Sequence, residues 1–231
     1  MFVTAEDFNT QPYDLPNLSE VPTEFPLFVT NNEDRELYKI LGVTFYEAFK
    51  AGIEALPEDW DDRPYSADAL VVYSKKIYKA LVDNTNVIPT SDPVTWEEQA
   101  ANKWLLLRDG ANYTDINGHK HKWAGMKSAI IPMIYSLWLR ADIDNKVTGA
   151  GNVKPNTENS VVISPNVRIV DAWNEFVIAV RTPCFIKRPG DLFGYLYNNA
   201  ADFDSDTPEF SSFVEYLAYE FRAPGRQSVF E

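Results

Sequence analysis

The chain contains only two histidines, His119 and His121, and a single residue separates them. In a β-strand this spacing points both imidazoles to the same face, where together they could bind a metal ion. A metal site needs at least one further ligand, and Asp115 is the nearest acidic residue. Two exposed histidines on a hairpin are more often ordinary polar surface. The sequence therefore favours a polar surface here, and we expect no bound metal.

A second acidic cluster resembles the start of a calcium-binding loop. Asp202, Asp204 and Asp206 alternate along the chain, as the first ligands of such a loop do. The loop also requires glycine at its sixth position and glutamate at its twelfth, where this chain has Thr207 and Phe213. We expect these aspartates to solvate a loop and to stabilise the positive end of the helix that follows.

The remaining residues form no recognisable catalytic pattern. Cys184 has no histidine near it in the sequence, which is typical of a structural cysteine. The glycines at 149–151 match neither a phosphate-binding loop nor a dinucleotide fingerprint, and no nucleophile elbow or HExxH motif occurs. We expect a protein that is not an enzyme and that holds no cofactor.

Composition narrows the class of protein further. Among 231 residues, 21 Lys+Arg against 34 Asp+Glu give a net charge of −13, which opposes binding to nucleic acid through the overall field. One cysteine excludes an internal disulfide and fits a reducing compartment. The first residues carry no basic segment followed by an apolar one, so we expect no signal peptide. The longest apolar run is shorter than the roughly 20 residues that cross a membrane.

The elements that position these residues are predicted to be mostly helices. Apolar residues recur at three- and four-residue steps in five segments, which predicts helices near 31–57, 96–110, 123–140, 165–180 and 207–221. Asn32 is the expected cap of the first helix. Asn117-Gly118 predicts a two-residue hairpin turn with positive φ at both positions, directly before the third helix.

Residues 65–97 interrupt the helical pattern. Two apolar segments, Leu70–Tyr73 and Ile77–Leu81, flank Ser74-Lys75-Lys76, which is typical of a short hairpin. We therefore expect a mainly α fold with a small β insertion. Its predicted parts are an extended arm (1–30), a helical core (31–64 and 98–182), the insertion (65–97), and an aromatic connection with a helix (183–231).

An ordered set of motifs suggests a family. A W-x-L-L-x-x-G-x-x-Y segment precedes the hairpin, and W-x-G-M-K opens the apolar helix after it. The residues concerned are Trp104, Leu106, Leu107, Gly110, Tyr113, Asn117, Gly118, Trp123, Gly125, Met126, Lys127 and Tyr135. Together with the first predicted helix, this order resembles the head–tail connector (adaptor) proteins of tailed phages that infect Bacteroidetes, including crAss-like phages. It covers roughly residues 20–56 and 98–182. Met126 in place of the usual leucine and Pro132 within the helix depart from the family pattern.

The resemblance implies a structural virion protein with a connector-type helical bundle. Such a protein forms a homo-oligomeric ring, a dodecamer, that joins the portal protein to further neck or tail proteins in the phage neck. Such a protein assembles in the host cytoplasm and does not bind a membrane. DNA passes through the lumen without specific binding, and an anionic lumen suits that passage because it repels the phosphate backbone.

The β insertion carries a second resemblance. Residues 65–97 are similar to the small carbohydrate-binding module of chitinases and phage appendages, on the residues Tyr73, Tyr78 and Trp96. Aromatic rings stack on sugars, but in so small a module they also supply most of the core. The alternative function is therefore a glycan-binding protein of a phage appendage, and we favour a structural decoration.

Residues 143–164 are predicted to be a long loop that contacts a neighbouring subunit or the portal. Such a length is unusual for a simple connection between two helices. Val161, Val162 and Ile163 are apolar and prone to form a strand, so pairing with another chain would cover them. A loop that folds back on its own subunit is the alternative. Lys146 and Lys154 are the expected polar contacts in an acidic chain.

Overall fold

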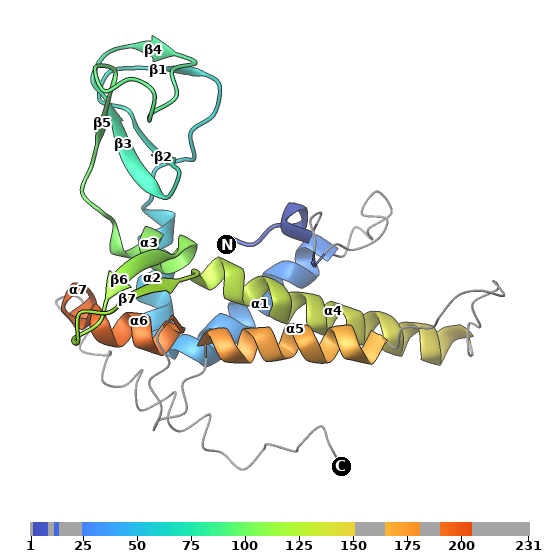
Figure 1. The fold of residues 1–231 in the computed structure, drawn as a ribbon. Helices are drawn as coiled ribbons and strands as arrows, with labels where there is room; N and C mark the ends of the chain where they lie inside the picture. Colours follow the sequence, from blue (N-terminus) through green and yellow to red (C-terminus); the bar gives the residue numbers. More distant parts are fainter. Residues whose placement is uncertain (1, 9–11, 14–24, 151–164, 181–189, 205–231) are drawn as a thin grey trace.

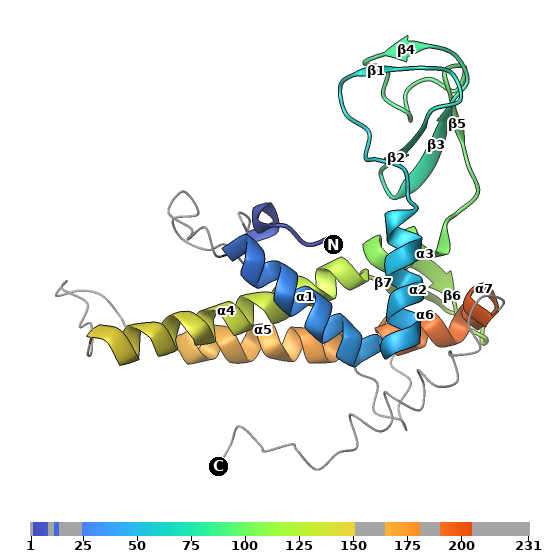
Figure 2. The ribbon, with the colours of Figure 1, turned by 180° about the vertical axis from the view of Figure 1, so that it is seen from behind.

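The structure is a computed structural model that describes residues 2–8, 12–13, 25–150, 165–180 and 190–204 (Figure 1). Within this part, 52% of the residues are helical and 16% lie in strands of three small antiparallel sheets. The prediction of a mainly α bundle is therefore wrong, because the described part of the chain is a mixed α/β fold. Its helices form an elongated body, and most of its strands lie in a separate module (Figure 2).

The body contains helices and one hairpin. In chain order its elements are η1 (Ala5–Phe8), α1 (Phe25–Leu41), α2 (Val43–Glu54), α3 (Lys103–Asp109), β6 (Ala111–Thr114), β7 (Lys120–Trp123), α4 (Met126–Ala150), α5 (Pro165–Val180), α6 (Leu192–Asn198) and α7 (Ala200–Asp204). The predicted third and fourth helices are confirmed as α4 and α5. The predicted first helix is divided at Gly42, whose φ of 71° lies in the left-handed region.

The first helix begins well before its predicted cap. Asn32 lies buried within α1, where its side-chain amide donates to the carbonyl of Phe28 (2.8 Å). The earlier start follows from Phe25 and Phe28, whose rings pack edge-on against Trp138 of α4 with centroids 4.8 and 5.0 Å away. Because Trp138 is distant in the sequence, local periodicity could not reveal this contact.

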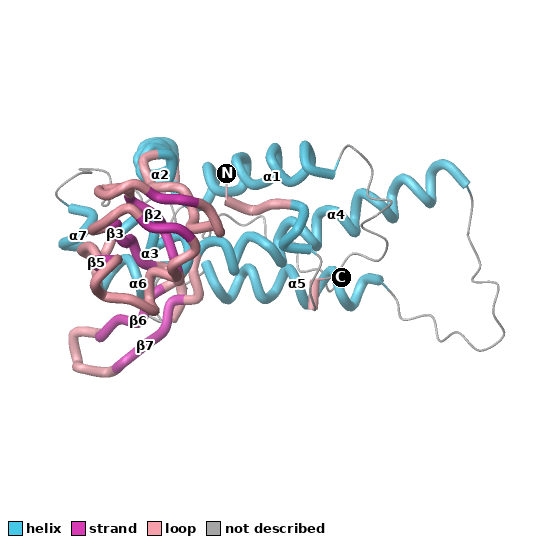
Figure 3. Tube along the Cα trace, turned by 90° about the horizontal axis from the view of Figure 1, so that it is seen from above, coloured by secondary structure: helices cyan, strands magenta, loops and turns pink. Residues whose placement is uncertain are grey.

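Helices α4 and α5 lie side by side and extend away from the rest of the body (Figures 1 and 3). Residues 143–150, predicted to begin a loop, are the last turns of α4. The inner end of the pair belongs to one large core that also includes α1, α2 and α6. Its largest fully buried side chains are Trp123, Phe8, Phe25, Phe45, Phe49, Phe203, Leu37, Leu41, Leu107 and Met126.

The β module contains five short strands: β1 (Pro64–Tyr65), β2 (Leu70–Tyr73), β3 (Lys76–Ala80), β4 (Asn84–Thr85) and β5 (Trp96–Glu98). They form a three-stranded sheet in the order β2-β3-β5 and a two-stranded sheet, β1-β4. The module has its own small core, and the Lys75 ammonium group donates to the Asp109 carbonyl of the body. The predicted hairpin is thus confirmed, with its turn at Ser74-Lys75.

The helix predicted from Trp96 is wrong, and this error contributes to the wrong fold class. Trp96 pairs with Ala80 in the sheet, and α3 starts only at Lys103. Asn102 caps α3, because its side-chain oxygen accepts the N–H groups of Trp104 and Leu105. The strand forms because the Trp96 ring fills the module core, a requirement that outweighs the local preference of the segment for helix.

A buried carboxylate attaches the start of the described chain to α1. Glu33 is 1% exposed and its two side-chain oxygens accept the backbone N–H groups of Phe2 (3.1 Å) and Val3 (3.3 Å). Burial raises the pKa of Glu33, and the two backbone hydrogen bonds partly offset this. The pair of bonds places the Phe2 ring against Phe49 of α2, with centroids 5.6 Å apart.

We expect Glu33→Ala to cost about 1–3 kcal/mol of unfolding free energy, because two buried N–H groups lose their acceptors. Glu33→Gln keeps one acceptor and should cost less. Since the folded pKa is raised, the folded chain binds this proton more readily than the unfolded chain does. Stability therefore falls as the pH rises through the carboxyl range. Urea unfolding of wild type and Glu33→Gln should show the difference shifting in favour of wild type as the pH falls. A difference independent of pH would contradict this.

Candidate functional site

The histidines lie on the hairpin between α3 and α4. In the β6–β7 pair, Tyr113 stands opposite His121 and Ala111 opposite Trp123, and their side chains share the face directed at α6. The Trp123 ring stacks on Tyr195 of α6, and the Tyr113 hydroxyl accepts the N–H of Gly190 (3.0 Å). These contacts fix the hairpin on the body.

The turn of this hairpin differs from the predicted two-residue turn. Only Gly118 has positive φ (86°), and Asp115 and His119 form the closing pair, with the Asp115 N–H donating to the His119 carbonyl (2.9 Å). The Gly118 N–H donates to the Asp115 carbonyl (2.9 Å). The connection is thus a three-residue loop with glycine at the left-handed position, the second most common hairpin class. Its extra residue pairs Asp115 with His119, and from this position the Asp115 carboxylate reaches both histidines.

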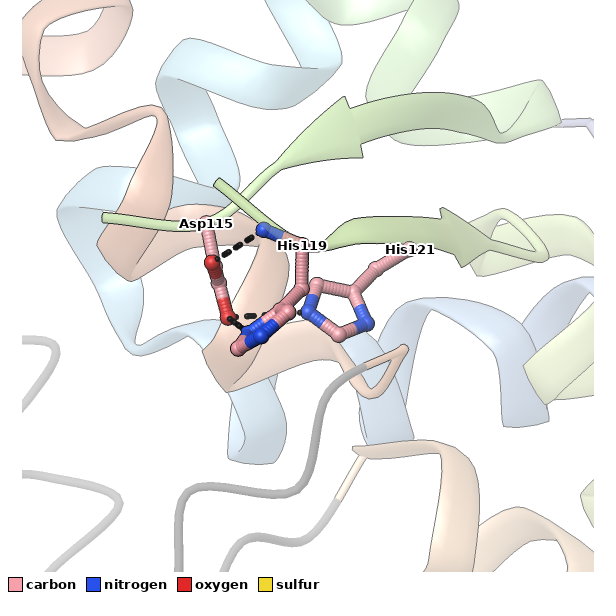
Figure 4. A group of neighbouring side chains, drawn as sticks. All are labelled: Asp115, His119 and His121. Carbon is pink, nitrogen blue, oxygen red and sulfur yellow. Dashed lines mark hydrogen bonds and ion pairs between the residues drawn. The ribbon is translucent and has the colours of Figure 1, made fainter. Parts of the chain in front are cut away.

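The Asp115 carboxylate is held from both sides (Figure 4). Oδ1 accepts the backbone N–H groups of Asn117 (2.9 Å) and His119 (2.8 Å). Oδ2 faces both imidazoles, at 3.3 Å from His119 Nδ1 and 3.0 Å from His121 Nε2. The side chains of Asp115 and His121 are 17% and 16% exposed, whereas His119 is 72% exposed. Two members of the cluster are therefore fixed, and the third lies at the surface.

The electrostatics of the cluster favour the ionised carboxylate. The hydrogen bond from His121, followed by those from the backbone of His119 and Asn117, holds the pKa of Asp115 well below its usual range. Asp115 thus keeps its negative charge at neutral pH. The arrangement presents two imidazole nitrogens and one carboxylate oxygen within 4.8 Å of one another. The sequence had identified Asp115 as the nearest third group, and the structure brings it into contact with both histidines.

The three aromatic residues singled out in the module do not form an exposed platform. Trp96 is 2% and Tyr78 5% exposed, and both belong to the module core. The indole N–H of Trp96 donates to the Val87 carbonyl (2.8 Å). Tyr73 is half-buried and packs edge-on against Trp60 (5.5 Å), a ring that the sequence analysis did not single out. Trp96 and Tyr78 therefore serve the core.

The remaining residues that the sequence singled out either do not belong to the histidine cluster or lie outside the described residues. Lys146 is in the last turns of α4, and Lys154, Val161, Val162 and Ile163 lie outside the described residues. Cys184, Asp206 and the helix expected after Thr207 also lie outside them. Asp202 is exposed on α7.

Comparison of the chain with protein-family models, with curated proteins and with solved structures finds no match. Among the described residues, no helix combines the length and the apolar character that a membrane crossing requires.

Proposed function

We propose that this chain is a structural virion protein that assembles into a ring, a dodecamer, joining the portal of a phage head to its tail. The observation that carries the proposal is the long arm formed by α4 and α5. Figure 3 shows α4 continuing past the start of α5, and its outer end lies away from every other element in the described part of the chain. Helices in proteins are stabilised mostly by packing against other elements. An arm only two helices thick has little of its own chain to pack against, so it is suited to contact a partner.

The surface of the body offers apolar groups for such contacts. Ile178 on α5 is 57% exposed, and Leu27 on α1 is 61% exposed. The half-buried Trp173 ring on α5 adds to this surface. The Arg140 guanidinium of α4 lies over this ring, 5.5 Å from its centroid. Exposed apolar and aromatic side chains of this kind are typical of protein–protein contacts.

Charge and motif order support the same proposal. The net charge of −13 repels the phosphate backbone, so DNA could slide through a channel lined by this chain. The motif that resembles the connector family spans α3, the β6–β7 hairpin and the start of α4, and these segments form one packed unit around Trp123. The buried Trp96 and Tyr78 rings favour a structural module over the alternative, glycan binding.

Electron microscopy of the purified chain, alone and mixed with the portal protein of the same phage, tests the proposal. We expect closed rings of uniform diameter, formed by the chain alone or seated on the portal. A monomer under both conditions, at every concentration tried, would refute the ring.

A pair of matched variants locates the subunit contact. Ile178→Glu should abolish the rings, because burying an unpaired carboxylate in a contact repeated around the ring costs several kcal/mol per contact. Val94→Glu is the control, since Val94 is 74% exposed and lies on the module. Both variants should keep the helical circular dichroism signal. Rings that form equally well with Ile178→Glu would place the contact elsewhere.

A further inference from the structure

We propose that Asp115, His119 and His121 bind a divalent transition-metal ion of the zinc class. The ligand atoms are Asp115 Oδ2, His119 Nδ1 and His121 Nε2. The inference does not depend on the proposed assembly function, because it rests only on the geometry of the β6–β7 hairpin.

The distances fit a tetrahedral ion. With metal–ligand bonds near 2.0–2.2 Å, the ligand atoms of a tetrahedral zinc site lie about 3.3–3.5 Å apart. Asp115 Oδ2 lies 3.3 Å from His119 Nδ1 and 3.0 Å from His121 Nε2, and all three atoms lie within 4.8 Å of one another. A small rotation of the exposed His119 ring, and a separation of Asp115 Oδ2 from His121 Nε2 that grows by a few tenths of an ångström, would complete the triangle.

The carboxylate is oriented before any ion binds. Because Oδ1 is occupied by the N–H groups of Asn117 and His119, Oδ2 is left facing the imidazoles. Partners of this kind, which fix the direction of a ligand, are a regular feature of metal sites. Asp115 directly follows β6, His119 directly precedes β7, and His121 lies in β7. The ion would therefore link the end of β6 to β7.

Ligand chemistry selects the class of ion. Two imidazoles and one carboxylate suit Zn²⁺ and its neighbours rather than Ca²⁺ or Mg²⁺, which prefer oxygen ligands alone. When the ion binds, each ring hydrogen that faces Asp115 moves to the other ring nitrogen, so the coordinating nitrogen presents a lone pair. Three protein ligands leave a fourth position, which water fills in the isolated chain.

The test is a titration of the full chain, prepared without a histidine tag, with ZnCl₂. Since the chain has only two histidines, their imidazole proton NMR signals can be assigned from His119→Ala and His121→Ala. We expect both signals to shift together and to stop shifting at one equivalent of Zn²⁺. Calorimetry on the same samples gives the affinity.

Variants separate a built site from weak surface binding. His121→Ala and Asp115→Asn should each weaken Zn²⁺ binding about tenfold or more. Asp115→Asn retains an oxygen for the two backbone N–H groups, so the turn should keep its shape. Lys120→Ala, on the outward face between the histidines, and Cys184→Ser, which removes the only thiol, should bind Zn²⁺ as wild type does.

Three results would overturn the proposal. The first is a shift of the His119 signal alone, which would indicate a single exposed imidazole. The second is binding unchanged by Asp115→Asn, and the third is binding lost equally in Lys120→Ala or Cys184→Ser. Circular dichroism of each variant distinguishes these results from a failure to fold.

Discussion

Replacing Gly125 with alanine should lower the unfolding free energy by about 3–5 kcal/mol, the combined cost of a left-handed residue and of an overpacked contact. Gly125 has φ of 101°, and a Cβ there would lie 2.5 Å from the backbone carbon of Asp109 and 2.6 Å from the Arg108 carbonyl oxygen. Because these are backbone atoms at the end of α3, they cannot rotate aside. The start of α4 would have to move away from α3.

Gly110, at the end of α3, shows the same close approach between the two backbone segments. A Cβ at Gly110 would lie 2.5 Å from the Trp123 carbonyl oxygen, so the two glycines allow the strand ends to cross closely. This crossing sets Trp123 in the core, where its indole N–H donates to the Leu107 carbonyl (3.0 Å). Moving the end of α3 away from the segment that joins β7 to α4 would therefore weaken the packing of Trp123, the largest fully buried side chain in the body.

Gly118→Ala is the matched control. Gly118 also has positive φ (86°), but a Cβ there meets no atom within 4 Å. Its cost should be limited to the conformational term, about 1–2 kcal/mol. Urea unfolding followed by circular dichroism compares the two variants with wild type. Equal losses in both would mean that φ alone, and not the crossing, determines the effect.

Much of the fold could be predicted from local patterns. Apolar residues at helical spacing located α2, α4 and α5, and the alternation around Ser74-Lys75 located the first hairpin. The predictions failed where a contact distant in the sequence decides the structure. Phe25 belongs to α1 because it packs on Trp138, and Trp96 lies in a strand because it completes the module core. Neither partner is visible from a local window.

The candidate site was half predicted for a similar reason. Strand spacing placed His119 and His121 on one face, as the structure shows. The approach of Asp115 depends on the three-residue turn and on two backbone N–H groups that orient its carboxylate. A two-residue turn at Asn117-Gly118, which the sequence predicted, would have given a different register. The geometry of the cluster therefore became apparent only with the backbone in place.

The second large effect should come from Trp96→Ala, which we expect to unfold the β module and to leave the helical body folded. Trp96 is one of five buried residues in the module core, the others being Tyr65, Val71, Tyr78 and Ala80. Its ring packs edge-on against Tyr65 (5.5 Å). Truncating a buried aromatic ring costs about 3–5 kcal/mol, which a core of this size cannot spare.

The body should survive because its core is separate. The buried cluster of the body contains no residue of the module among the described residues, and the module core contains none of the body. Limited proteolysis of Trp96→Ala should therefore cut within residues 64–98, while the helical circular dichroism signal stays near that of wild type.

Trp123→Ala provides the mirror image of this experiment. Trp123 is 1% exposed and stacks on Tyr195 in the body, so the same substitution there should reduce the helical signal instead. The pair tests whether the chain unfolds in two units or one. A joint loss of module and body in Trp96→Ala would show that the two cores are coupled, through contacts such as the one between Lys75 and the Asp109 carbonyl. Independent unfolding would mean that the module can be removed or replaced without disturbing the arm that we propose as the site of assembly.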